Sequence, residues 1–121
     1  MQARPWEVPI RAAWHRATEL TEVRFGREGL TLRLVEEDTE QTWVMTFASV
    51  QAFKSTTEEC AASILSRLPE QGGFFEVLDS PWLDELGRGQ ASFLDEARHY
   101  VICCYDEVIE IVGGACRLEK A

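Results

Sequence analysis

Carboxylates are the side chains in this sequence with the most scope for chemistry. The chain of 121 residues carries 21 Asp and Glu against 12 Lys and Arg, which gives a formal net charge of −9 at pH 7. Acidic residues crowd segment 36–41, and Asp106, Glu107 and Glu110 interrupt the longest apolar run. Paired carboxylates can serve as general acid and base, or they can bind a hard cation.

Both acidic groups also have a simpler interpretation. Segment 36–41 lacks the Asp-x-Asp-x-Asp-Gly spacing of a calcium loop, so we expect a solvated hairpin turn and no metal site. Asp106-Glu107 is not the Asn-Gly or Asp-Gly pair of a tight hairpin, so we expect the chain to bend there rather than reverse. The pair forms either a plain turn or an acidic recognition patch. We take Asp106, Glu107 and Glu110 as candidate binding residues.

Catalysis by histidine or cysteine is not predicted. His99 and Cys103 fall on one strand, about 13 Å apart at ~3.3 Å per residue, which is too far for a nucleophile and its base. We expect His99 to be a partly exposed residue at a strand end. The four cysteines have no Cys-x-x-Cys spacing, and Cys103 and Cys104 point to opposite faces of a strand. We therefore expect buried free thiols in a reducing cytoplasm, not metal ligands.

Common enzyme motifs are missing as well. The sequence contains no glycine pattern for phosphate binding, no Gly-x-Ser-x-Gly and no His-Glu-x-x-His. We therefore predict no catalytic residue and no cofactor, and we favour a binding protein over an enzyme. Trp82, which follows Ser80-Pro81, joins the candidate binding residues because an amphipathic indole ring can anchor a partner. Packing in the core or at its rim is the alternative for this ring.

The elements that must position these groups are mainly β-strands. Segment 100–105 is entirely apolar, so both of its faces should be covered, as in a central strand, and 108–112 continues the pattern. Alternation in 30–34 and 43–47 predicts an antiparallel hairpin. We expect a short strand at 23–25 before it, a fourth strand of the same meander at 50–54, and a further strand at 74–78.

A change of period predicts one main helix, Thr57–Leu68. Two overlapping capping boxes begin at Ser55 and Thr56, and apolar residues at 60, 64, 65 and 68 fall on one helical stripe. The predicted fold is α+β: a mainly antiparallel sheet of roughly five to seven strands with this helix packed on one face. Residues 1–121 form a single domain, and residues 1–20 form a docked N-terminal arm. A parallel α/β fold is disfavoured because the connecting turns are too short for crossovers.

Charge and targeting features limit the classes of partner and the compartment that we expect. A net charge of −9 repels phosphate backbones and anionic lipid, so we predict no nucleic-acid or membrane partner, whereas a basic protein would be attracted. The alternative is that the acidity only secures solubility. Without a span of ~20 apolar residues or an apolar signal region, we expect a cytoplasmic protein. Segment 115–118, if it lies at a sheet edge, could pair with a second copy to form a homodimer.

A resemblance points in the same direction. The run Arg98–Ile102, followed by Tyr105–Glu110, resembles a segment of small uncharacterised bacterial proteins. In size and charge the chain is similar to the immunity proteins that neutralise secreted bacterial toxins. The resemblance implies a non-catalytic protein-binding domain that inhibits a basic partner, such as a toxin or a nucleic-acid enzyme. A small enzyme or ligand-binding protein with an unrecognised pocket is the alternative.

Overall fold

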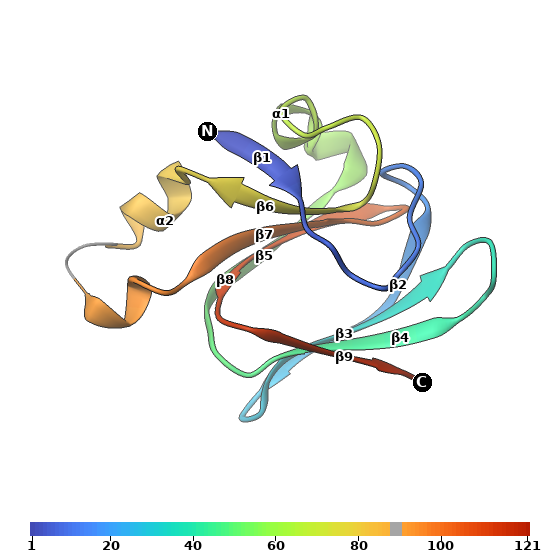
Figure 1. The fold of residues 1–121 in the computed structure, drawn as a ribbon, viewed down its shortest axis with the longest axis horizontal. Coiled ribbons are helices and arrows are strands. Elements are labelled where there is room, and N and C mark those ends of the chain that lie inside the picture. The colour runs from blue at the N-terminus through green and yellow to red at the C-terminus, as the bar shows by residue number, and fades with distance from the viewer. Residues whose placement is uncertain (88–90) are drawn as a thin grey trace.

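Two antiparallel β-sheets lie face to face in the computed structural model, which describes residues 1–87 and 91–121 (Figure 1). One sheet has the order β1-β6-β7-β8-β5 and the other the order β2-β3-β4-β9. The strands are β1 (Gln2–Pro5), β2 (Thr18–Gly26), β3 (Gly29–Glu36), β4 (Thr42–Phe47), β5 (Val50–Thr57), β6 (Phe74–Leu78), β7 (Arg98–Cys103), β8 (Glu107–Gly113) and β9 (Cys116–Lys120). The predicted antiparallel pairing is therefore confirmed.

The main core lies between the two sheets. Alternate residues of β3 and β4 point into it, among them Leu32 and Met45, which are fully buried. Alternate residues of β7 and β8, among them Ile102 and Ile109, meet them from the opposite sheet. The predicted hairpin of 30–34 and 43–47 is confirmed, because Leu32 pairs with Met45 in the β3–β4 register.

Strand β7 is the middle strand of the five-stranded sheet, as predicted. Its inner face carries Ile102 in the main core, while Val101 and Cys103 on the other face belong to a second apolar cluster. The residues 61–68 and Phe75 and Val77 of β6 complete that cluster. Both faces of β7 are thus covered, which explains why its sequence is apolar without alternation.

The expected α+β fold with a main helix at Thr57–Leu68 is wrong. Strands make up 51% of the structure and helix only 12%, so the class is an antiparallel β-sandwich. Segment 50–57 continues as strand β5 along β8, with Thr56 opposite Val108, and only the short turns η1 (Glu58–Cys60) and α1 (Ala62–Leu65) follow. The side chain of Thr57 forms no capping hydrogen bond. No helix among the described residues is long and apolar enough to cross a membrane.

Strand pairing overrides the helical pattern for a physical reason. Pairing with β8 satisfies the backbone groups of 52–57 that face β8, and it suits the β-branched Thr56 and Thr57, which lose side-chain freedom in a helix. The apolar stripe still has a role, because Ala61, Ile64 and Leu68 pack on the outer face of the five-stranded sheet. Apolar residues with helical spacing can therefore cover a sheet without forming a long helix.

Two further expectations about strand order are corrected. Segment 50–54 is not a fourth strand of the meander, because β5 joins the other sheet after the two-residue link 48–49. Gly113 permits this tight crossing, since a Cβ atom there would lie 2.4 Å from the Ser49 carbonyl oxygen. The chain also reverses at 104–106 instead of bending, because β7 and β8 pair as a hairpin with Cys103 opposite Val108.

The ends of the chain lie on different sheets. In the first residues, β1 pairs with β6, and the ring of Trp6 lies 4.3 Å from the ring of Tyr100 between centroids. At the other end, β9 pairs only with β4 and forms an edge of the four-stranded sheet. The edge position is what the homodimer hypothesis requires, and association itself stays a prediction. Two short elements, α2 (Pro81–Glu85) and η2 (Ser92–Leu94), lie beyond one end of the sheets (Figure 1).

The central position of β7 predicts the result of a core truncation. Ile102→Ala should lower the free energy of unfolding by about 2–5 kcal/mol, since it leaves a cavity between the sheets. That is a large share of the ~5–15 kcal/mol typical of a domain. Urea unfolding measures the change, and Val23→Ala, at a residue 41% exposed, is the matched control with a loss below about 0.5 kcal/mol. Equal losses in both variants would contradict this account of the core.

Candidate functional site

The four candidate binding residues lie in two separate places. Asp106 and Glu107 lie at the tip of the β7–β8 hairpin, at one end of the sandwich. Glu110 of β8 and Trp82 of α2 both surround His99, farther along the same sheet. The structure therefore brings the candidates together as two pairs and not as one patch.

His99 is the centre of a buried hydrogen-bonded chain. Its side chain is 3% exposed, so the expectation of a partly exposed residue is wrong. The Nε2 atom lies 2.9 Å from Glu110 Oε1, and Nδ1 lies 2.7 Å from Ser80 Oγ. Because a carboxylate only accepts, Nε2 donates to Glu110, and Nδ1 shares the second hydrogen bond with the Ser80 hydroxyl.

The order Ser80, His99, Glu110 is that of a nucleophile, a base and an orienting carboxylate, but access is missing. Ser80 is fully buried, and its Oγ atom also accepts the backbone N–H of Leu83 at the start of α2. No substrate carbonyl can reach this hydroxyl. The arrangement instead fastens α2 to the five-stranded sheet and satisfies three buried polar side chains.

Trp82 and Lys54 close this network on its outer side. The Trp82 ring contacts His99 edge to face with centroids 5.2 Å apart, and the Lys54 ammonium lies 4.3 Å from the centre of the same ring. Lys54 Nζ also lies 3.7 Å from Glu110 Oε2. The carboxylate of Glu110, which is only 6% exposed, thus has partners within the chain on both oxygens.

The cysteines offer no reactive site in the core. Cys103 and Cys104 are both buried, and they belong to different apolar clusters on opposite sides of the sheet, as predicted. Burial raises the pKa of the Cys103 thiol to about 12, so it stays protonated at neutral pH. The expectation of burial is wrong for Cys60, which is exposed.

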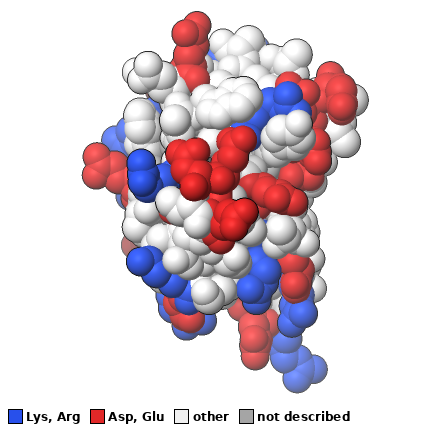
Figure 2. Space-filling view, turned by 90° about the vertical axis from the view of Figure 1, so that its right-hand side faces the viewer, with Lys and Arg blue, Asp and Glu red and all other residues white. Residues whose placement is uncertain are grey.

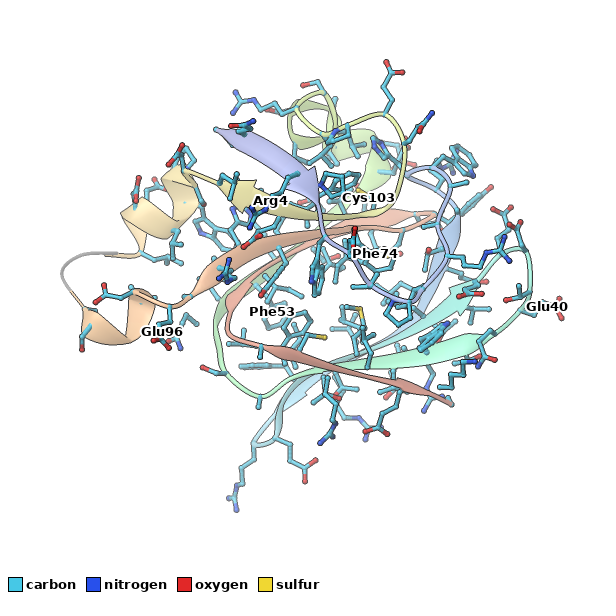
Figure 3. All side chains as sticks on the ribbon, viewed as in Figure 1. Arg4, Glu40, Phe53, Phe74, Glu96 and Cys103 are labelled. Carbon is cyan, nitrogen blue, oxygen red and sulfur yellow. The ribbon has the colours of Figure 1, made fainter. Side chains whose placement is uncertain are left out.

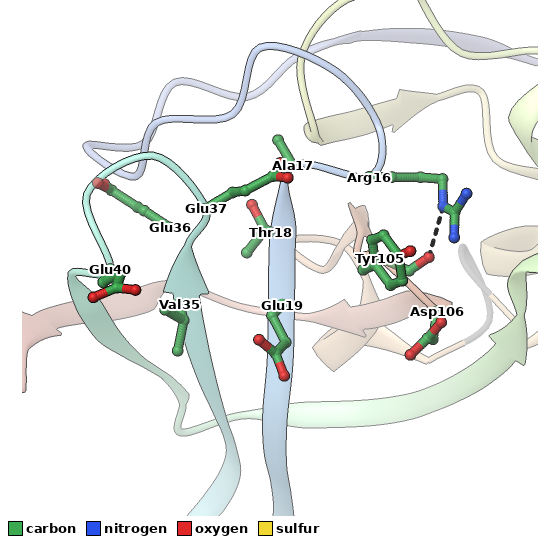
Figure 4. A pocket seen from close by; sticks show the side chains of 10 residues that line it. All are labelled: Arg16, Ala17, Thr18, Glu19, Val35, Glu36, Glu37, Glu40, Tyr105 and Asp106. Carbon is green, nitrogen blue, oxygen red and sulfur yellow. Dashed lines mark hydrogen bonds between the residues drawn. The ribbon is translucent and has the colours of Figure 1, made fainter.

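The hairpin tip, by contrast, borders an open acidic cleft. The cleft has a volume of about 520 Å³ and is formed where the tip meets β2 and the β3–β4 loop (Figure 4). It is lined by Arg16, Ala17, Thr18, Glu19, Val35, Glu36, Glu37, Glu40, Tyr105 and Asp106. Figure 2 shows acidic side chains gathered at the centre of this face of the molecule.

One backbone hydrogen bond between the sheets, and one that extends the β2–β3 pairing, build the cleft. The N–H of Tyr105, at the hairpin tip, donates to the carbonyl of Thr18 in the other sheet at 2.8 Å. The N–H of Glu37 donates to the carbonyl of Ala17 at 3.1 Å. Arg16 donates from Nε to the Tyr105 carbonyl at 2.9 Å, and its guanidinium lies 4.2 Å from the centre of the Tyr105 ring (Figure 4). The walls are therefore fixed by the fold.

Glu36 is a structural carboxylate at the buried side of the cleft. It is 4% exposed, and it accepts hydrogen bonds from the backbone N–H of Arg11, from Trp43 Nε1 and from the Thr39 hydroxyl. Burial acts to raise the pKa of Glu36, but these hydrogen bonds outweigh it and hold the pKa below the ordinary value. Glu36 is thus ionised, and its two carboxylate oxygens already accept three hydrogen bonds from the chain itself.

The remaining carboxylates of the cleft form no ion pair with another described residue. Glu19, Glu37, Glu40 and Asp106 are exposed, and none of them takes part in an ion pair between described residues. Nearby, partial burial and the charges of Asp106 and Glu19 raise the pKa of Glu107. Burial makes the largest contribution to this rise in pKa, and the two neighbouring carboxylates add to it.

One buried polar atom in the cleft is also unsatisfied. Thr18 is 0% exposed, and its hydroxyl has no hydrogen-bond partner among the described residues, although the residue lines the cleft. Buried hydroxyls are almost always paired, because an unpaired one costs free energy. Figure 4 shows Thr18 in the middle of the wall, between Ala17 and Glu19.

Sequence reasoning found Asp106 and missed most of the cleft. Glu19 lies among other polar residues of β2, and Thr18 precedes it without any motif. Segment 36–41 was identified as acidic, and residues 37–41 form the predicted hairpin turn between β3 and β4, but Glu36 ends β3 and is buried instead of solvated. Only the packing of two sheets brings these segments to Asp106. Within the described residues, no group of three His, Cys, Asp or Glu is placed to bind a metal ion.

Comparisons with family models, with curated proteins and with solved structures give no match for this chain. Function is therefore argued from the site alone.

The hydrogen bonds that the Glu36 carboxylate accepts predict a pH-dependent loss of stability. At neutral pH, Glu36→Gln should lower the free energy of unfolding by about 1–2 kcal/mol, because hydrogen bonds to a charged acceptor are stronger than those to an amide. A folded-state pKa below the unfolded value stabilises the protein above that unfolded value, and the contribution is lost as the pH falls through the folded pKa.

Urea unfolding between pH 3 and pH 7 checks this prediction. The difference between wild type and Glu36→Gln should be full at pH 7 and should shrink below about pH 4.5. Glu37→Gln, which neutralises the exposed neighbour, is the matched control and should cost little at any pH. A Glu36→Gln protein as stable as the wild type at pH 7 would contradict the role assigned to Glu36.

Proposed function

We propose that this chain is a non-catalytic protein-binding domain whose acidic cleft receives a basic partner. The observation that carries the proposal is the open cleft lined by Glu19, Glu37, Glu40 and Asp106, none of which is in an ion pair between described residues. Carboxylates that repel one another are stabilised when a cation is brought between them. A basic partner supplies such cations, and the charge of −9 steers it to the molecule.

The size of the site favours a protein partner. Specific protein interfaces usually bury more than about 1,000 Å² in total, so the cleft would be the centre of a larger contact. Exposed Tyr105 beside it, at 48% exposure, offers the kind of aromatic side chain enriched at such centres. An inhibitor of a toxin or nucleic-acid enzyme would need a face of this kind, because it must cover a cationic phosphate-binding surface.

The enzyme alternative has less support from the same residues. General acid and base catalysis needs a titratable pair within reach of one substrate atom. In the cleft Glu36 is occupied by its own hydrogen bonds, and around His99 the Ser80 hydroxyl is buried. The cleft therefore leaves only exposed carboxylates from separate segments for this role, and the site around His99 lacks an accessible nucleophile.

Affinity capture from the native host tests the proposal. The chain, immobilised through its C-terminus, should retain a basic protein at low ionic strength and release much of it at high salt, because exposed charges are screened within ~10 Å at 0.1 M salt. Retention of an acidic partner that is indifferent to salt would remove the physical basis of the proposal, as would no retention at all.

A pair of charge-neutralising variants separates recognition from stability. Asp106→Asn with Glu107→Gln should leave the unfolding midpoint unchanged or slightly raised, since it relieves repulsion at the hairpin tip, and should weaken capture by about tenfold. The matched control is Asp95→Asn with Glu96→Gln, the same chemical change at exposed residues far from the cleft. Figure 3 shows Glu96 and Glu40 at opposite ends of the molecule. Equal capture by both double variants would exclude the hairpin tip as a recognition surface.

A further inference from the structure

We propose that strand β9 pairs with β9 of a second copy of this chain, in an antiparallel arrangement centred on Leu118. This pairing is separate from the proposed function, because no residue of β9 lines the acidic cleft. Strand β9 is available for it, since β9 pairs only with β4 and forms an edge of its sheet (Figure 1). The pairing joins the four-stranded sheets of two copies into one continuous sheet across a two-fold axis.

The other three edge strands of the described residues each carry a feature that disfavours pairing. Strand β1 is only four residues long and includes Pro5, which has no backbone N–H to donate. Strands β2 and β5 are interrupted by a shift of register, at Thr21 and at Gln51 respectively. Prolines and bulges are features by which edge strands avoid association. Strand β9 has neither, because its five residues pair with β4 in an unbroken register.

The backbone of β9 presents hydrogen-bonding groups at the open edge of the sheet. The N–H of Ala121 donates to the carbonyl of Thr42 at 3.0 Å, so the backbone groups of Ala121 face β4. These groups alternate in direction along a strand. Glu119 and Arg117 therefore also face β4, whereas Leu118 and the residues two positions before and after it face the open edge. All three of these residues can pair with the same three in a second copy.

The charges of β9 select one register for that pairing. When two copies of a strand pair about a two-fold axis, the axis passes through one residue, because opposite residues must direct their backbone groups in the same sense. An axis through Arg117 or Glu119 places like charges directly opposite one another, which is destabilising. An axis through Leu118 places Arg117 of each copy opposite Glu119 of the other, and it overlaps all five residues of β9.

The side chains of β9 suit this register on both faces of the sheet. Arg117 and Glu119 lie 2.9 Å apart within one chain, and both are largely exposed, so they can also reach a second copy. On the other face, Leu118 packs at the rim of the main core and is only half-buried. In the paired strands Leu118 of each copy covers the other, which removes further apolar surface from water.

The local charge of β9 reduces the repulsion between two acidic chains. Arg117 and Lys120 outnumber Glu119 in this strand, so segment 116–120 is net cationic, whereas the whole chain carries a net charge of −9. Charges elsewhere on the two copies are largely screened beyond ~10 Å at 0.1 M salt. The edge that is regular in its backbone is thus also the edge where close approach is favoured by charge.

Exchange of the two charges tests the register, with sedimentation velocity in about 0.1 M salt as the measurement. The wild type should dimerise at chain concentrations up to about 1 mM. Arg117→Glu and Glu119→Arg should each weaken dimerisation at least about tenfold, because each variant places like charges opposite one another twice. An equimolar mixture of these two variants should form a heterodimer as readily as the wild type dimerises, since opposite charges then face each other again.

Strand β2 provides matched controls on the opposite edge of the same sheet. Glu22 and Arg24 form an exposed ion pair of the same kind, at 3.0 Å. Arg24→Glu and Glu22→Arg make the same changes in net charge as the β9 variants, and they should leave dimerisation within about twofold of the wild type. Because all four side chains are exposed, the unfolding midpoint of each variant in dilute solution should stay close to that of the wild type.

The β9 pairing would be overturned by a wild type that stays monomeric at about 1 mM. It would also be overturned if the β9 variants dimerised as well as the β2 variants, or if the mixture formed no heterodimer. Weaker dimerisation by Arg117→Glu together with stronger dimerisation by Glu119→Arg would show that net charge alone controls association, and it would exclude this register. None of these results bears on the acidic cleft, whose role is tested separately by capture with the Asp106→Asn/Glu107→Gln variant.

Discussion

The burial of the β7–β8 hairpin on both faces is the constraint on which the rest of the structure depends. One face packs against β3 and β4, where Ile102 and Ile109 meet Leu32 and Met45. The other face is covered by segment 61–68 and by α2. A hairpin with both faces buried can expose polar groups only at its ends, so the acidic pair at 106–107 lies at the reversal. The location of the cleft follows from that placement.

The two ends of the sandwich are closed in different ways. Near Gly113 the chain crosses between the sheets twice, through the links 48–49 and 114–115, and backbone approaches backbone closely. At the opposite end the sheets meet through the Tyr105–Thr18 hydrogen bond. Side chains from both sheets diverge around that contact and leave the acidic cleft. The position of the proposed binding site is therefore a consequence of how the sheets are joined.

The sequence predicted local pairing well and the arrangement of the sheets poorly. Alternation in 30–34 and 43–47 and the apolar run 100–105 identified strands, because burial on one or both faces leaves a direct pattern. Segment 57–68 was misassigned because capping boxes and a helical stripe are local signals, whereas the pairing of Thr56 with Val108 is not. Sequence gives no rule for which sheet β5 joins. For that reason, segment 50–54 was wrongly predicted to be a fourth strand of the meander.

In the candidate site, too, only the residues that leave a local signal in the sequence were predicted. Asp106 was identified because charges that interrupt an apolar run are visible locally. Thr18 was not identified, since its significance depends on being buried without a partner beside residues more than 80 positions away (Figure 4). His99 was misjudged for a similar reason, because its partners come from other elements.

The central claim is that the carboxylates at this end of the sandwich repel one another until a cation arrives, and the pKa of Glu107 tests it most directly. A carbon-13 NMR titration of the Glu107 carboxyl should give a pKa above the ordinary range for glutamate, because partial burial and the charges of Asp106 and Glu19 disfavour ionisation. Asp106→Asn, which removes one of those charges, should lower that pKa. An ordinary pKa for Glu107 that does not respond to Asp106→Asn would contradict the account.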